Sequence, residues 1–136
     1  VIDQFANIRM SPIFSLEAVC IITQHGFEAL GVRRIQAGQH TNLSGWQNRM
    51  ELAGYRIEGI HKDKFVKGNE ISDSVTIAIT YDSYRYLTSK RNGNLWDSRD
   101  SMETRLLKLP TKTLKKSLTK FMEDTAAIYY ESIYDL

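Results

Sequence analysis

The stretch that decides the fold runs from Gly31 to Thr80 and reads GVRRIQAGQHTNLSGWQNRMELAGYRIEGIHKDKFVKGNEISDSVTIAIT. Its last part alternates strictly between apolar and polar residues at Val75, Ile77 and Ile79, which is typical of a strand with one buried face. Turn-forming residues separate the segments along it. The predicted elements, in chain order, are a strand over 32–37, a helix over 43–53 that ends at Gly54, a strand over 55–66, a turn at Lys67-Gly68-Asn69 and a strand over 72–80.

The segment before this stretch predicts a long amphipathic helix. Ser11-Pro12 or Ser15 supplies its start, because a serine oxygen can accept a free amide hydrogen bond and proline suits the first helical position. Gly31 ends it. Apolar residues recur at spacings of three and four, which places them on one helical face: Leu16, Val19, Cys20, Phe27 and Leu30. We expect Val1 to Met10 to form a strand.

Beyond Thr80 the sequence predicts helices. Residues 82–90 fit a helix and 91–94 a turn, whereas the pattern over 95–109 does not distinguish between helix and loop. Pro110 opens a long final helix. Its apolar positions repeat at a helical period: Leu114, Leu118, Phe121, Met122, Tyr129 and Ile133. Lysines flank this helix, and a solvated helix face or contact with RNA or an acidic partner would each explain them.

Composition limits the range of functions. The chain has 136 residues, a net charge of +2 and one cysteine. This length suits one domain, and the small charge gives no general attraction to nucleic acid or to a membrane. A lone cysteine cannot form an internal disulfide, and no long apolar run is present, so we expect a cytoplasmic protein. The three histidines are too widely spaced to predict a metal site.

The order of these segments resembles the GNAT superfamily of acyl-CoA-dependent N-acyltransferases, in particular the branch with ribosomal-protein and amino-sugar acetyltransferases. The features that carry the resemblance are the helix followed by Gly31-Val32-Arg33-Arg34-Ile35, then Asn42, Gly54-Tyr55, Glu58-Gly59 and Asp73. The resemblance covers about residues 1–85 and corresponds to the carboxy-terminal half of that fold. It implies an α/β (α+β) fold, in which a mixed sheet is flanked by helices and residues 86–136 form a helical extension.

The resemblance also implies acetyl-CoA as the acyl donor. The family holds the CoA pyrophosphate at the amino-terminal turn of the first helix, where free amides and the helix dipole favour an anion. The residues that correspond to this cofactor site are Arg9, Met10, Ser11, Ile13, Phe14 and Ser15. Asn42 matches an asparagine that contacts the pantetheine arm, although asparagine is also a common turn former. No glycine occurs between Val1 and His25, whereas the family's pyrophosphate loop is rich in glycine.

For catalysis, the resemblance points to Glu58 as a base or water-ordering group for an amine, because a protonated amine must lose a proton before it attacks. A carboxylate on an exposed strand explains Glu58 equally well. Many family members carry a tyrosine general acid four residues before the closing glycine, where this chain has Met50. Ser44 is the nearest substitute, and we expect Tyr55 to pack in the core.

The sequence therefore predicts an N-acetyltransferase that acts on a primary amine, either an amino sugar or other small amine, or a protein amino terminus. Because the family's amino-terminal half has no counterpart, we expect the chain to be a fragment, to be completed by a second chain, or to form a homo-oligomer. The alternative is a non-catalytic interaction module that binds a partner through its final amphipathic helix. We expect the Ser15–Leu30 helix on one face of the sheet and the Asn42–Ala53 helix on the other.

Overall fold

The computed structural model describes residues 12–41 and 44–109. The predicted strand over 1–10 and the predicted helix from Pro110 lie outside these residues. The described elements are α1 (Pro12–Glu28), β1 (Arg34–His40), α2 (Ser44–Leu52), β2 (Arg56–Lys67), β3 (Glu70–Thr80), α3 (Tyr81–Ser89) and α4 (Arg99–Lys108).

The three described strands form one antiparallel sheet in the order β1-β3-β2. β3 is the central strand, and Ile77 faces Ala37 of β1 on one side and Ile57 of β2 on the other. Directly opposite residues in an antiparallel pair point to the same side of the sheet. Val75, Ile77 and Ile79 are each at most 1% exposed and therefore define one buried face across all three strands. The predicted alternation of β3 is confirmed.

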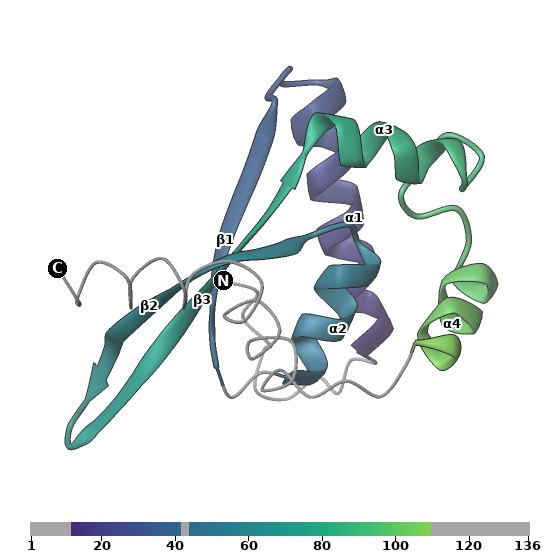
Figure 1. Cartoon of the computed structure of the whole chain (residues 1–136). Coiled ribbons are helices and arrows are strands. Elements are labelled where there is room, and N and C mark those ends of the chain that lie inside the picture. Colours follow the sequence, from purple (N-terminus) through teal and green to yellow (C-terminus); the bar gives the residue numbers. More distant parts are fainter. Residues whose placement is uncertain (1–11, 42–43, 110–136) are drawn as a thin grey trace, which may run out of the picture.

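Both α1 and α2 pack on this same face of the sheet, so the expected placement on opposite faces is wrong. Ile35, opposite Ile79, lies against Gly26 of α1. Gln39, opposite Val75, donates a hydrogen bond to Gln47 of α2 at 2.6 Å. Ile35 and Gln39 are four residues apart in one strand and point to one side, so the two helices share that side. Figure 1 shows them together beside the sheet.

Both helices have an apolar side that must be covered. They share one face of the sheet because that face carries the apolar row of β3. A contiguous core joins α1, α2, β3, α3 and α4. Within it, Thr23 of α1 and the Tyr55 hydroxyl, at the entry to β2, are 2.8 Å apart and hydrogen-bonded, and both residues are buried. Phe27 of α1 stacks on Tyr84 of α3 with ring centroids 4.8 Å apart. The α/β class with a sheet flanked by helices is confirmed.

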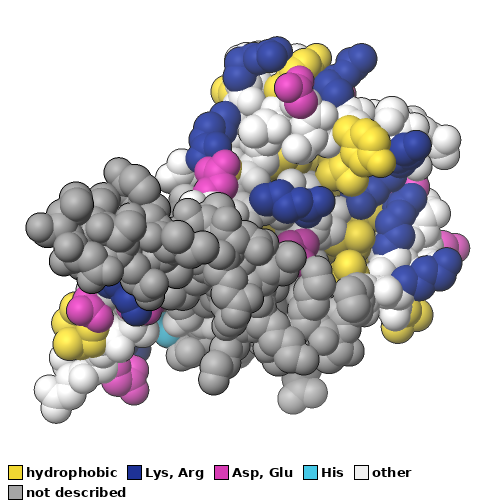
Figure 2. All heavy atoms as spheres, in the orientation of Figure 1, with side chains coloured by type: hydrophobic (Ala, Val, Ile, Leu, Met, Phe, Trp, Pro, Cys, Tyr) yellow, Lys and Arg dark blue, Asp and Glu magenta, His cyan; other side chains and the backbone are white. Residues whose placement is uncertain are grey.

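The opposite face of the sheet is polar in the described part of the chain. Its strand positions carry residues such as Arg34, Gln36, Arg56 and Glu58, all of them exposed. Beyond the helices, β2 and β3 continue as a two-stranded ribbon whose tip bears Phe65, Val66 and Ile71 at 40%, 67% and 61% exposure. Figure 2 shows hydrophobic and charged side chains next to one another at this end of the molecule.

The segment after α3 joins the same core. Leu95 and Met102 are fully buried in it, although no clear element was predicted over 95–109. The Arg91 side chain, only 5% exposed, donates hydrogen bonds to the carbonyl oxygens of Leu52 at 2.7 Å and Leu95 at 3.1 Å. It therefore joins the end of α2 to the α3–α4 connection. Among the helices within residues 12–41 and 44–109, none is both long and apolar enough to cross a bilayer.

The predicted helix end at Gly54 is confirmed, and its backbone has a φ of +100° that only glycine adopts easily. An added Cβ would lie 2.5 Å from Leu87 Cδ1 and 2.7 Å from Ile79 Cδ1. Gly68, in the hairpin turn, also has a positive φ, of 60°, but a Cβ there would have no atom within 4 Å.

We expect Gly54→Ala to lower the free energy of unfolding by about 1–3 kcal/mol more than Gly68→Ala does, because only the first adds overpacking to the cost of a left-handed backbone. Urea denaturation of both variants and the wild type measures the difference. Equal losses in the two variants would contradict this account of Gly54.

Candidate functional site

The first turn of α1 lies at one end of the core. Pro12 occupies the first helical position, which confirms the predicted helix start. The Ile13 side chain is buried in the core, whereas Phe14 is 40% exposed and its ring lies 5.5 Å from the Arg99 guanidinium carbon of α4. Ser15 is half-buried. Ile13 thus anchors the turn, and any ligand contact of Ile13 would come from its backbone.

The first turn of α2 lies at the same end. β1 ends at His40, Thr41 donates its backbone amide to the Asp73 carbonyl oxygen at 3.3 Å, and α2 then begins at Ser44. In Figure 1 the first turns of α1 and α2 lie at the same end of the helical layer, which is also the end toward which β1 runs. The opening amides of a helix have no intrahelical acceptor, and the helix dipole adds partial positive charge there. Each of these two helix ends favours an anionic ligand.

Glu58 lies on the polar face of the sheet, away from α1 and α2. It is the extra residue of a β-bulge between Ile57 and Gly59 in β2. Arg34 donates hydrogen bonds to both of its carboxylate oxygens, one of them at 2.7 Å, and also donates to Gln36 at 3.0 Å. The Arg34 hydrogen bond lowers the pKa of Glu58, so this carboxylate is a weak proton acceptor while the pair is intact.

A comparison with solved structures finds acetyltransferases. A GCN5-related N-acetyltransferase from Brucella melitensis overlaps with a TM-score of 0.56 at 21% identity, over 77% of this chain and 46% of that one. A probable GNAT-family acetyltransferase from Chromobacterium violaceum overlaps with a TM-score of 0.50 at 19% identity, over 59% of this chain and 39% of that one. A GNAT-family acetyltransferase from Bacillus anthracis is 29% identical over 51% of this chain and 42% of that one, with a TM-score of 0.48.

This chain has the fold of GNAT acetyltransferases. The resemblance inferred from Gly31 to Thr80 is thereby confirmed at the level of fold. The chain spans less than half of the length of each of these three structures. No family model matches the sequence, and no curated protein matches it either.

The cofactor residues predicted from the GNAT resemblance are only partly described. Arg9, Met10, Ser11 and Asn42 lie outside the described residues. Ser44 opens α2, but its side chain is not described. Ile13, Phe14 and Ser15 all fall in the first turn of α1, as expected. The three residues are adjacent in space because one helical turn carries them, and their role in binding stays a prediction.

Met50 stands where many GNAT members carry a tyrosine general acid, and its side chain packs in the core. Met50 is 5% exposed and belongs to the core, so it faces the sheet and not solvent. Tyr55 is also buried, as predicted, and burial raises the pKa of its hydroxyl, which is hydrogen-bonded to Thr23. Neither residue is placed to give a proton to a leaving group at the helix ends, which leaves Ser44 as the predicted donor.

Cys20 is not a reactive thiol, and a metal cluster is not found in the described part of the chain. Burial raises the pKa of the Cys20 thiol to about 12, so it stays protonated and inert in the core. Within residues 12–41 and 44–109, no three His, Cys, Asp or Glu side chains come together as a metal site.

Sequence reasoning missed a buried amide pair beside the candidate site. Gln39, near the end of β1, is 4% exposed and donates to Gln47 of α2, which is 1% exposed. The Oε1 atom of Gln39 is buried and has no hydrogen-bond partner among the described residues. A buried acceptor without a partner is costly and usually marks a place where water or a ligand donates. No signal in the sequence distinguishes these two glutamines from exposed ones.

We expect Arg34→Gln to raise the pKa of Glu58, because the variant removes the hydrogen-bonding cation that stabilises the charged carboxylate. Carboxyl-carbon NMR titration of the folded protein measures the shift. Lys62→Gln is the matched control, since Lys62 pairs with Asp73 at 3.2 Å. It should raise the pKa of Asp73 and leave that of Glu58 unchanged. A Glu58 pKa that is the same with and without Arg34 would contradict the pairing.

Proposed function

We propose that this chain is the cofactor-binding half of an N-acetyltransferase, which uses acetyl-CoA to acetylate a primary amine. The observation that carries the proposal is the overlap of 77% of the chain with a GCN5-related N-acetyltransferase. The first turns of α1 and α2 lie at the same end of the helical layer, and a helix amino-terminus suits a pyrophosphate.

The cofactor site that we propose is built on the first turn of α1. Pro12 has no amide hydrogen to donate, so the pyrophosphate would rest on the amides of Phe14 and Ser15, on the Ser15 hydroxyl and on Ser11, with Arg9 supplying positive charge. Asn42, just before α2, would hold the pantetheine arm. A phosphate group fits this end because the described residues of the first turn, Ile13 to Ser15, carry no acidic side chain.

Acetyl-CoA supplies a thioester: the amine nitrogen forms a bond to the acetyl carbon while the carbon–sulfur bond breaks, and the amine loses a proton. Glu58 is on the polar face of the sheet, opposite the helices. We infer that the acceptor approaches from that face while the cofactor occupies the helical end. With Arg34 bound, Glu58 would order a water that takes the amine proton, and Ser44 would protonate the thiolate.

The acceptor class that we favour is a small amine such as an amino sugar, with a protein amino terminus as the second candidate. The net charge of +2 gives no strong docking surface for a macromolecule. Because the chain spans less than half of the three solved structures named above, we infer that the acceptor pocket needs further protein, either from the same polypeptide, from a second chain or from another copy of this one. The proposed compartment is the cytoplasm.

Calorimetry with acetyl-CoA on the 136-residue chain tests the cofactor site. We expect micromolar binding that Ser15→Glu weakens at least about tenfold, because a carboxylate in the first turn occupies the anion site and repels the pyrophosphate. The same substitution should not lower the melting temperature, since an acidic residue stabilises a helix amino-terminus. A loss of binding in Ser15→Glu is therefore not attributable to unfolding.

The matched control is Ser89→Glu at the far end of α3, which makes the same change of charge outside the site and should bind acetyl-CoA as the wild type does. An absence of heat with the wild-type chain, and with a longer natural chain that contains it, would overturn the proposed cofactor site. If both variants bind acetyl-CoA equally weakly, the change in net charge explains the loss of affinity, and this result would also count against the site.

The buried position of Met50 favours a second candidate, a non-catalytic GNAT-type module that binds a partner through the segment after Pro110. A protein without a general acid need not catalyse transfer. This alternative predicts no acetyl-CoA binding, together with loss of self-association or partner association on replacing Leu118 and Phe121 by aspartate. Sedimentation velocity on wild type and variant separates it from the enzyme.

A further inference from the structure

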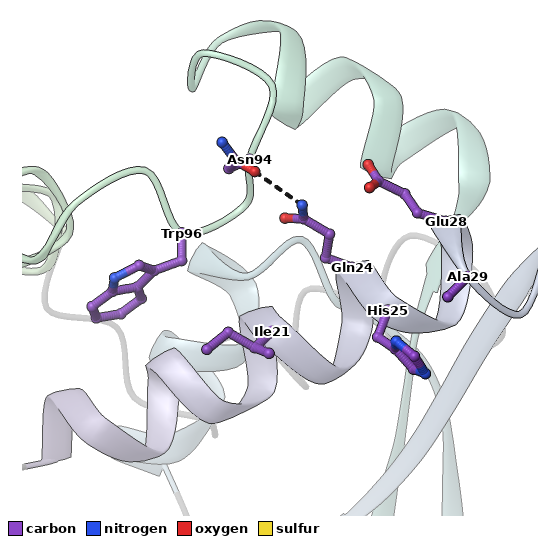
Figure 3. Close-up of a pocket in the computed structure, with 7 residues that line it drawn as sticks. All are labelled: Ile21, Gln24, His25, Glu28, Ala29, Asn94 and Trp96. Atoms are coloured by element: carbon purple, nitrogen blue, oxygen red, sulfur yellow. Dashed lines mark hydrogen bonds between the residues drawn. The ribbon is translucent and has the colours of Figure 1, made fainter.

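A groove of about 360 Å³ runs along the outer side of the last turns of α1 (Figure 3). One wall comes from α1 and the residue after it, and the other from the connection between α3 and α4. The lining residues are Ile21, Gln24, His25, Glu28, Ala29, Asn94 and Trp96. The groove lies near the carboxy-terminal end of α1, so it is separate from the first turn of that helix.

The floor of the groove is held by a fixed amide network. Gln24 donates its Nε2 to the Asn94 side-chain oxygen at 2.9 Å, and its Oε1 accepts the Leu95 backbone amide at 3.2 Å. Figure 3 shows this pair bridging the two walls at mid-groove. Leu95 is fully buried, and its side chain anchors the connection in the core. The groove therefore has a preformed shape, which lowers the entropy cost of binding.

The two ends of the groove differ in character. Trp96 and Ile21 make one end apolar, and Ile21 is 56% exposed. Glu28 makes the other end anionic. The Tyr84 hydroxyl donates a hydrogen bond to Glu28 Oε1, which orients the carboxylate, and no hydrogen bond to Oε2 is found among the described residues. Ile21 and Glu28 are seven residues apart, or about 10 Å along a helix.

The cations around the groove limit what can bind. Arg85 lines a second hollow on the other side of Glu28, together with Tyr84 and Thr88. His25 lines the groove itself, and in Figure 3 its ring points away from Asn94. A ligand with charge at both ends would place one charge at the apolar end or against Arg85. A single positive charge on an apolar body matches both ends.

We propose that this groove binds an amphiphilic organic cation, with a primary ammonium at Glu28 and an apolar or aromatic body about 10 Å long that reaches Trp96 and Ile21. An ammonium next to a carboxylate forms a charge-assisted hydrogen bond, and the indole and isoleucine side chains cover the apolar body. The inference does not rest on the proposed acetyltransferase activity.

The test is an NMR titration at low salt that follows the Trp96 indole and Asn94 side-chain amide signals of the full chain. The probe is 4-phenylbutylamine, and 4-phenylbutanol is its uncharged counterpart. We expect saturable shifts at both signals and a dissociation constant about threefold lower for the amine, in keeping with one exposed charge pair. 1,4-Diaminobutane, which lacks an apolar body, should bind more weakly than the phenyl amine.

Two variants assign the effect to the groove. Glu28→Gln keeps an acceptor for the Tyr84 hydroxyl but removes the charge, so the preference for amine over alcohol should disappear. Ile21→Ser, at an exposed position, should weaken both phenyl probes alike. Glu103→Gln on α4 makes the same charge change elsewhere and should keep the preference. Equal affinity of amine and alcohol for the wild type, or a preference that survives in Glu28→Gln, would overturn the proposal, as would the absence of shifts at Trp96 and Asn94.

Discussion

The antiparallel pairing of β3 with both of its neighbours is the constraint on which the rest of the described structure depends. Val75, Ile77 and Ile79 have side chains on one face only, and their partners in β1 and β2 share that face. All three are buried, so the helical layer must cover them. A shift of one residue in either pairing would turn the inward-facing side chains of the partner strand to the polar side. The alternation of β3 therefore sets the face of the sheet that a helical layer has to cover.

One consequence is the separation of two chemical environments. α1 and α2 cover the apolar face and start at the same end, so both helices present free amides and positive dipole ends there. The other face carries the Arg34–Glu58 pair and exposed polar side chains. An anion is favoured at the first region, and a polar amine can approach the second without displacing the core.

Much of the fold was predictable because its signals are local. Pro12 as the first helical residue, Gly54 as a helix end and the turn at Gly68 each follow from backbone conformations that one residue type favours. Cys20 and Tyr55 were expected in the core and are buried there. α4 was left undecided between helix and loop, because its apolar positions are few: Met102 is buried in the core, and Leu106 and Leu109 pack against it only in part. The side of the sheet on which α2 packs was predicted wrongly, because the hydrophobic period of a helix does not say which face of a sheet it covers.

For the candidate site, sequence resemblance named the first turn of α1, but the environment of each residue came from long-range contacts. Arg34 and Glu58 are 24 residues apart, and only strand register brings them together. Arg91 reads as a turn residue and is in fact buried against Leu52, 39 residues away. The sequence by itself determined the elements from α1 to α3, their order and the apolar face of β3, since these depend on neighbouring residues. Only the tertiary structure decided the layer of α2, the partner of Glu58 and the groove beside Trp96, because each requires segments distant in the chain to meet.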